Sequence, residues 1–141
     1  MNFIVEGKPQ GKARARTFYN EKRGKMQSIT PEKTKSYEDL IRWKYKATGG
    51  EYMGEAILKV EIQAYYPIPQ SYSKAKREAA IHDVIRPTVK PDTDNIIKVV
   101  LDALNGVAYY DDKQVVYVSC SKYYSQGTGY LWIDIEKLGD R

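Results

Sequence analysis

The stretch EAILKVEIQAYY, residues 55–66, carries the clearest structural pattern in the chain. Its apolar side chains alternate with charged and polar ones, a period of two that is typical of a half-buried β-strand. The positions expected on the buried face are Ala56, Leu58, Val60, Ile62 and Ala64. Pro67 and Pro69 follow directly, and proline interrupts the hydrogen bonding of a sheet. We therefore expect a strand that ends at these prolines and packs one face on a hydrophobic core.

Helical spacing appears on both sides of this strand. Thr30 and Pro31 form a helix start signal, with Thr30 as the cap, and the helix that follows should end by Gly49. Residues 73–85 predict a second helix that Ser73 caps. Residues 95–104 predict a third helix. Its apolar face consists of Ile96, Val99, Val100, Ala103 and Leu104.

The remaining apolar runs are predicted strands. Residues 2–6 form a first strand, and a basic loop then leads into a second short strand. Residues 114–124 and 129–137 are expected to pair as a hairpin around SQGTG. The order β-β-α-β-α-α-β-β indicates a single α/β domain of the α+β type over residues 1–141, with a mixed sheet packed against helices.

Composition narrows the functional classes. No apolar run has the roughly 20 residues of a membrane span, and the single cysteine, Cys120, is typical of a protein in the reducing cytoplasm. Neither a P-loop nor a dinucleotide-binding glycine pattern occurs, so we expect no nucleotide cofactor. His82 is the only histidine, which argues against a histidine-based nuclease or a catalytic triad.

The positive charge is concentrated near the amino terminus. Residues 7–46 contain 12 Lys and Arg but 4 Asp and Glu, whereas the chain as a whole carries a net charge of +5. An excess of basic residues of this kind suits either an acidic polymer such as DNA or a plain solvated surface. Three cations, Lys12, Arg14 and Arg16, alternate along an extended stretch and are candidate phosphate contacts. Arg86 and Lys90 are further candidates.

Acidic residues form two tight pairs, Asp92 with Asp94 and Asp111 with Asp112. We expect the short connection after the third helix to bring both pairs, together with Lys98, into one small volume. Neighbouring carboxylates repel, and a hard divalent cation such as Mg²⁺ removes that repulsion. The same residues also suit helix caps and turns, and Lys98 suits an ion pair with Asp94 or Asp102.

A resemblance favours the metal interpretation. The segment KPDTDNIIKVVLDALNG with the later DDKQV, together with GKARAR at residues 11–16, resembles the RusA family of Holliday-junction resolvases. The resemblance covers residues 11–16 and 90–115 and fits the overall length. It implies Asp92, Asp94 and Asp112 as metal-binding catalytic acids and Lys98 as a catalytic lysine. Asn95 is implied as an assisting residue, and Asp111 either assists the third acid or only shapes the turn.

The same resemblance implies the activity. It implies a homodimer that binds four-way DNA junctions and makes paired, symmetric nicks, with Mg²⁺ as cofactor and Mn²⁺ as a substitute. The small size also agrees with a phage or prophage resolvase. Two alternatives stay open at the level of sequence. One is a non-catalytic DNA-binding protein in which the aspartates only cap helices and form turns. The other is a metal-dependent phosphohydrolase of small substrates.

Overall fold

The central strand of the fold is β4 (Ile57–Pro67), and the other strands of its sheet assemble around it. The computed structural model describes the backbone of residues 1–141 and every side chain except that of Arg16. β4 pairs in parallel with β5 (Val115–Ser125) and antiparallel with β6 (Tyr130–Gly139). β1 (Asn2–Glu6) pairs antiparallel with β6, which gives a mixed sheet in the order β1-β6-β4-β5.

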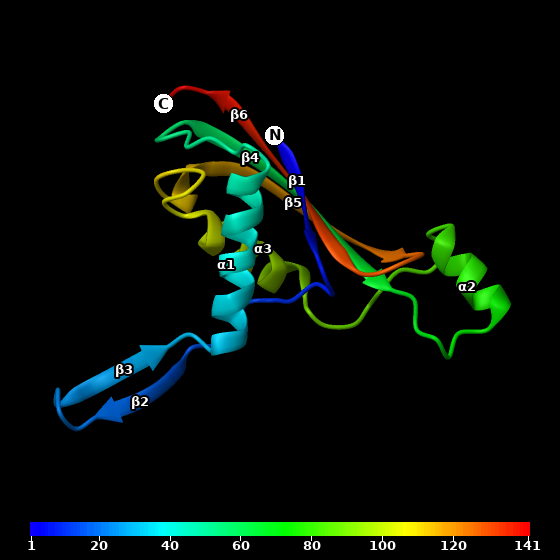
Figure 1. Cartoon of the computed structure of the whole chain (residues 1–141), viewed down its shortest axis with the longest axis horizontal. Helices are drawn as coiled ribbons and strands as arrows, with labels where there is room; N and C mark the ends of the chain where they lie inside the picture. The colour runs from blue at the N-terminus through cyan, green and yellow to red at the C-terminus, as the bar shows by residue number, and fades with distance from the viewer.

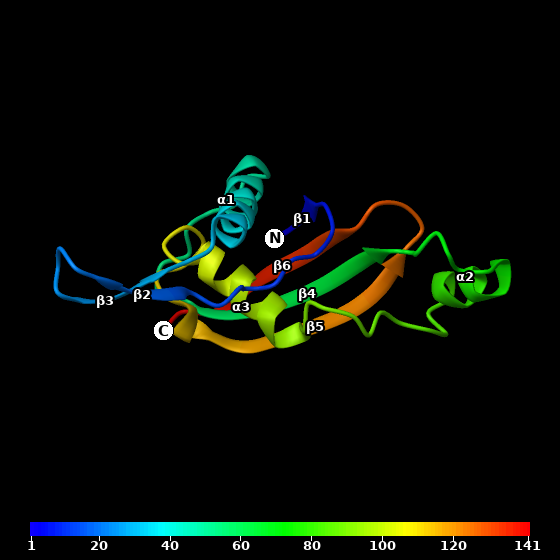
Figure 2. The same cartoon turned by 90° about the horizontal axis from the view of Figure 1, so that it is seen from below.

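Two helices cover one face of this sheet, α1 (Glu32–Ala47) on the β1 side and α3 (Thr93–Leu104) on the β5 side (Figures 1 and 2). The face of β4 beneath them is the one predicted from the alternation, and all five of its predicted side chains are buried. The apolar face of α3 was predicted correctly as well, because its five residues are fully buried against the sheet. Burial of this kind stabilises a helix more than its intrinsic propensity does.

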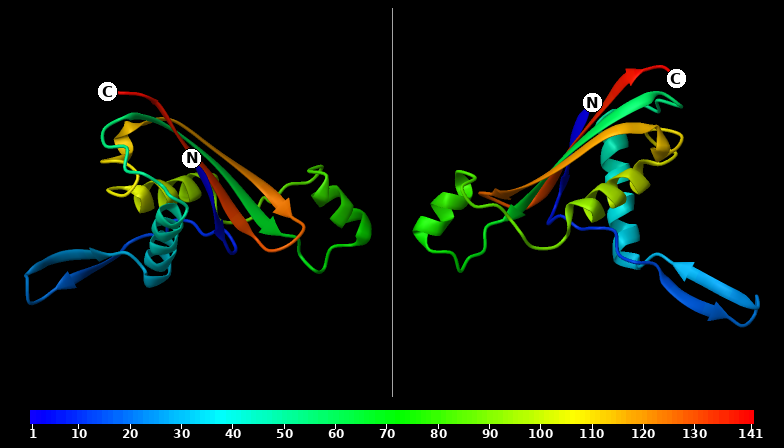
Figure 3. Two further views of the ribbon diagram at one scale, coloured as in Figure 1. Left: turned by 45° about the horizontal axis from the view of Figure 1, so that its top comes forward. Right: turned by 180° about the vertical axis from the view of Figure 1, so that it is seen from behind.

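Two elements project from opposite ends of the molecule (Figure 3). At one end lies α2 (Lys74–Ile81), where the side-chain oxygen of Ser73 accepts a hydrogen bond of 3.2 Å from the Lys76 N–H, as expected of a cap. At the other end β2 (Arg16–Asn20) and β3 (Lys25–Ile29) form a separate two-stranded hairpin. A short 3₁₀ turn, η1 (Asp112–Gln114), precedes β5.

The fold class is confirmed, a single α+β unit with a mixed sheet and three helices, but four details differ from expectation. The helix predicted for residues 73–85 ends at Ile81, because Asp83 has a left-handed backbone conformation that ends a helix. The hairpin predicted for residues 114–137 is wrong, because β4 lies between β5 and β6. The strand β3 was not predicted, because its side chains are nearly all exposed and leave no burial pattern. Thr30 does not cap α1, because Pro31 occupies the cap position and the helix begins at Glu32.

Within the part of the chain that the structure describes, no helix is both long enough and apolar enough to span a bilayer.

Candidate functional site

The first acidic pair lies at the amino-terminal end of α3. Asp92 occupies the cap position with extended backbone angles, and Asp94 lies in the first turn. Aspartate often caps a helix through its side chain, yet the Asp92 carboxylate accepts no capping hydrogen bond from the described backbone of α3. Both side chains are exposed. The fold therefore leaves these two carboxylates open to a ligand.

The turn that carries Asp92 is anchored to the sheet. The Tyr66 hydroxyl donates a hydrogen bond of 3.1 Å to the carbonyl oxygen of Pro91. Burial, with smaller effects of the neighbouring Cys120 and Asp92, raises the pKa of Tyr66 well above its ordinary value, so this hydroxyl keeps its proton at neutral pH. The Lys122 ammonium also donates to the carbonyl oxygen of Val89. Asp92 thus stands on a fixed turn.

The second acidic pair divides into two different roles. The Asp111 carboxylate accepts from the Lys113 N–H at 2.9 Å, and the Asp111 N–H donates to the Gln114 side chain at 2.8 Å. This reciprocal pattern is a capping box that starts η1. Gln114 in turn donates to the carbonyl oxygens of Gly54 and Ala56. Asp111 is therefore a turn residue.

Asp112 is the member of the pair whose carboxylate no cap engages. Its backbone N–H donates to the Asn105 side-chain oxygen at 2.8 Å, at the carboxyl end of α3. Partial burial raises the pKa of the Asp112 carboxyl, and the charges of Asp111 and Asp102 raise it further. A carboxylate placed under such repulsion is a natural ligand for a cation.

The two pairs lie at opposite ends of α3. A helix of 12 residues is about 18 Å long, and Asp92 precedes it whereas Asp112 is bonded to the residue that follows it. The expectation that the connection returns Asp111 and Asp112 to the first pair is therefore wrong for a single chain. The connection cannot return because the Gly106 N–H bonds to Tyr109 O and the Tyr109 hydroxyl bonds to Leu101 O, which keep it at the carboxyl end.

Lys98 lies one turn after Asp94, on the exposed side of α3. It takes part in none of the ion pairs among the described side chains, so the structural interpretation of Lys98 as a partner of Asp94 or Asp102 is not observed. The structure thus leaves this charge available to a substrate.

Lys12 has a different position from the one expected of a phosphate contact. Its ammonium lies 3.0 Å from Glu38 of α1 and 3.3 Å from Asp102 of α3. Burial alone would lower the pKa of Lys12, but the two carboxylates outweigh it and raise the pKa. Lys12 is therefore an internal link that ties the amino-terminal segment to both helices.

The amino-terminal segment passes very close to the start of α3. A Cβ atom added at Gly11 would lie 2.8 Å from the Cβ of Pro91 and 2.9 Å from the Cβ of Asn95. The Lys12 N–H donates to the carbonyl oxygen of Asn95 at 3.0 Å. Only glycine allows this approach, which explains the glycine in GKARAR physically. Asn95 is a support for the segment through its backbone.

This approach forms a basic cavity around Asp92. The cavity holds about 370 Å³ and is lined by Gly11, Lys12, Ala13, Arg14, Lys90, Pro91, Asp92 and Asn95. Arg14 and Lys90 are exposed cations. Three of the predicted phosphate contacts, Lys12, Arg14 and Lys90, therefore line one cavity with a predicted catalytic acid, and of these Lys12 is engaged by Glu38 and Asp102.

Comparison with known proteins decides the family. The sequence pattern of the family described as "Endodeoxyribonuclease RusA" matches residues 6–136. The chain belongs to the RusA family. A Bacillus subtilis (strain 168) protein named "Uncharacterized protein YqaN" is 35% identical over 128 residues, which cover 89% of each chain. The RusA family is one of endodeoxyribonucleases, so the resemblance found in the sequence is confirmed.

Nucleases of the RusA family generally depend on a divalent metal, and the acids of one chain do not fit such an ion by themselves. Among the residues that the structure describes, no group of three or more His, Cys, Asp or Glu side chains is placed to hold a metal ion. The cause is the separation along α3, which leaves two exposed carboxylates at one end and Asp112 at the other. Within one chain each end therefore holds only part of the set of acids that the RusA motif contains.

The remaining predicted DNA contacts of this RusA-family chain divide as follows. The Arg86 guanidinium stacks 3.9 Å from the centre of the Tyr123 ring and donates to the carbonyl oxygen of Lys122, so it supports the edge of β5. The side chain of Arg16 lies outside the described residues. Lys8 and Lys33, which belong to no sequence motif and were not predicted as DNA contacts, line a cavity beside the turn that carries Asp92.

Proposed function

We propose that the chain is a Mg²⁺-dependent Holliday-junction resolvase that acts as a homodimer and nicks two strands of a four-way DNA junction symmetrically. In this proposal residues 1–141 act as one endonuclease domain. The observation that carries it is the arrangement of the motif residues around α3. Asp92, Asp94 and Lys98 are exposed without structural partners among the described side chains, Asp112 is free of the cap that engages Asp111, and the cavity at Asp92 is basic.

The separation of the acids supports the dimer. If two copies are related by a two-fold axis that places their α3 helices side by side and antiparallel, the amino end of each helix meets the carboxyl end of the other. Asp92 and Asp94 of one copy then lie beside Asp112 of its partner. The same operation completes two identical sites, as symmetric cleavage of a junction requires. A single copy offers neither site in full.

Exposed apolar side chains support the same arrangement. β5 is an edge strand, and three consecutive residues of it, Val116, Tyr117 and Val118, are 64%, 54% and 38% exposed. Ile97 and Leu101, one turn apart on the neighbouring α3, are only partly buried. An uncovered edge with apolar side chains readily pairs with another chain. A second copy that covers this edge places the two α3 helices next to each other.

The chain's own residues then have separate roles. The carboxylates of Asp92, Asp94 and Asp112 hold the cation, and the chemistry expected from bound Mg²⁺ is activation of water and neutralisation of charge at the phosphate. Lys98 places a positive charge where negative charge develops in the transition state. Arg14 and Lys90 hold neighbouring phosphates. Asp111 and Asn105 position Asp112 through the cap and the backbone bond.

Cleavage of a labelled synthetic four-way junction, beside a linear duplex of the same sequence, tests the proposal. We expect paired symmetric nicks on the junction alone, which need Mg²⁺ and are lost with EDTA and in Asp112→Asn. A chain that binds junctions tightly but makes no nick in Mg²⁺ or Mn²⁺ is a DNA-binding protein. Hydrolysis of small phosphate esters without junction cleavage would identify a phosphohydrolase.

A further inference from the structure

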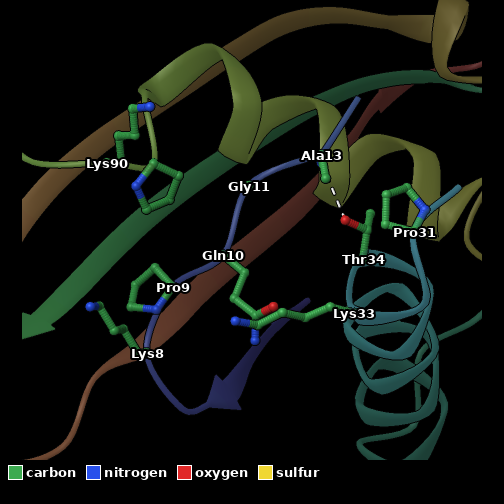
Figure 4. Close-up of a pocket in the computed structure, with 10 residues that line it drawn as sticks. Lys8, Pro9, Gln10, Gly11, Ala13, Pro31, Lys33, Thr34 and Lys90 are labelled. Carbon is green, nitrogen blue, oxygen red and sulfur yellow. Dashed lines mark hydrogen bonds between the residues drawn. The ribbon is translucent and has the colours of Figure 1, made fainter. Parts of the chain in front are cut away.

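A second and larger cavity lies beside the one at Asp92 (Figure 4). It holds about 530 Å³ between the segment that follows β1, the first turn of α1 and the turn before α3. Its lining residues are Lys8, Pro9, Gln10, Gly11, Ala13, Pro31, Lys33, Thr34, Lys90 and Pro91. These residues come from three separate parts of the chain, so the cavity exists only in the folded protein.

The charge of this cavity is uniform. Three of the lining residues are lysines, Lys8, Lys33 and Lys90, and none of the described lining residues is acidic. All three lysines are exposed, and none takes part in the ion pairs among the described side chains. In Figure 4 the three lysines come from different sides of the cavity, and the Gln10 and Lys33 side chains extend into its middle. Unpaired ammonium groups around one hollow attract an anion.

The rest of the lining indicates which anion. Rings of Pro9, Pro31 and Pro91 give the cavity apolar walls, and Gln10 adds a neutral amide. A phosphodiester chain combines negative phosphates with apolar faces of sugars, and therefore matches both parts of the lining. A small inorganic anion would leave the proline walls without a contact.

The larger cavity lies next to the candidate catalytic site at Asp92. It shares Gly11, Ala13, Lys90 and Pro91 with the cavity at Asp92, so the two hollows lie next to each other. A DNA strand whose phosphate lies at Asp92 can continue into the larger hollow without leaving the protein surface.

We call this hollow the lysine groove, which consists of Lys8, Gln10, Lys33 and Lys90. We propose that the lysine groove binds the sugar–phosphate backbone of the DNA strand that is cut, next to the nucleotide at Asp92. The proposal rests on the proposed function and adds the path of the substrate. Lys8 and Lys33 are binding residues that hold neighbouring phosphates, and neither touches the reacting atoms.

The test compares Lys8→Gln/Lys33→Gln with Lys46→Gln/Lys74→Gln, a control with the same loss of charge. Lys46 lies in the last turn of α1, about 20 Å along the helix from Lys33, and Lys74 begins α2. Binding of a labelled junction is measured without Mg²⁺ at several salt concentrations. Each lost phosphate contact should reduce the slope of log K against log salt by about 0.7–0.9. Each copy of the homodimer loses two contacts, so we expect a reduction of about 3 in the groove variant and a much smaller change in the control.

A set of junctions with single methylphosphonates then locates the contacts. For the wild-type protein, neutralising a phosphate next to the cut should weaken binding, and the groove variant should show no further loss at that same phosphate. Equal behaviour of the groove and control variants, while the wild-type protein binds and cuts the junction, would overturn the groove. A wild-type protein that neither binds nor cuts the junction would instead overturn the proposed function.

Discussion

Adjacent residues in this chain divide structural and functional roles. Asp111 is engaged by the capping box of η1, whereas the Asp112 carboxylate takes no part in that cap and has a raised pKa. The sequence DD predicts a turn and an acidic pair. It cannot indicate which of the two aspartates caps the turn, because either position allows the side chain to accept a hydrogen bond from the backbone that follows. The hydrogen bonds to Lys113 and Gln114 make the distinction.

The raised pKa of Asp112 predicts that, in the absence of metal, Asp112→Asn raises the free energy of unfolding by an amount that depends on pH. The folded state disfavours the ionised carboxylate of Asp112, and this lowers the free energy of unfolding. The loss of stability is complete above the pKa of the folded state. It disappears below the ordinary pKa of 3.8, where the carboxyl is protonated in both the folded and the unfolded chain. Thermal unfolding in EDTA should show Asp112→Asn above the wild type at pH 7, with the gain lost near about pH 3. A variant less stable than the wild type at pH 7 would contradict this account.

Asp111→Ala is the matched control, because it removes the neighbouring carboxylate together with the cap. The lost cap should cost about 0.5–2 kcal/mol of unfolding free energy. The melting temperature of Asp111→Ala at pH 7 should therefore lie below that of Asp112→Asn.

At the scale of elements, periodicity predicts helices and strands but not their neighbours. The buried faces of β4 and α3 were predicted correctly, because one side of each element is buried and carries apolar residues at regular spacing. The pairing of β5 with β4 was missed, because SQGTG marks a turn and carries no information on which strand lies alongside. The hairpin of β2 and β3 was half missed, because a solvent-exposed strand such as β3 needs no apolar alternation.

The exposed edge of β5 predicts a variant that separates the two copies. Val116→Lys places a charge at a position that is 64% exposed, so the unfolding free energy of the single chain should change by less than about 0.5 kcal/mol. Sedimentation should show a monomer, and junction cleavage should be lost. Val84→Lys, at a position 75% exposed in the segment before α3, should leave both properties unchanged. A dimeric and active Val116→Lys would exclude this edge as the interface.

At the scale of the whole molecule, the motif residues of the candidate site were predicted from sequence, but their assembly was not. The residue types and the spacing from Asp92 to Lys98 follow from one helix, so a single sequence shows them. The distance from Asp92 to Asp112 depends on the path of the connection after α3, which Tyr109 holds in place by a hydrogen bond to Leu101. That Lys12 links two helices also depends on tertiary contacts, with Glu38 and Asp102.

Cleavage by mixed dimers of Asp92→Asn and Asp112→Asn tests the central claim most directly. Each variant alone should be inactive on the junction. Heterodimers, isolated through different tags on the two copies, contain one site in which both Asp92 and Asp112 are intact, so the account predicts a restored single nick per junction. Folded heterodimers that make no nick, beside a wild-type protein that cuts normally, would contradict a site shared between two copies.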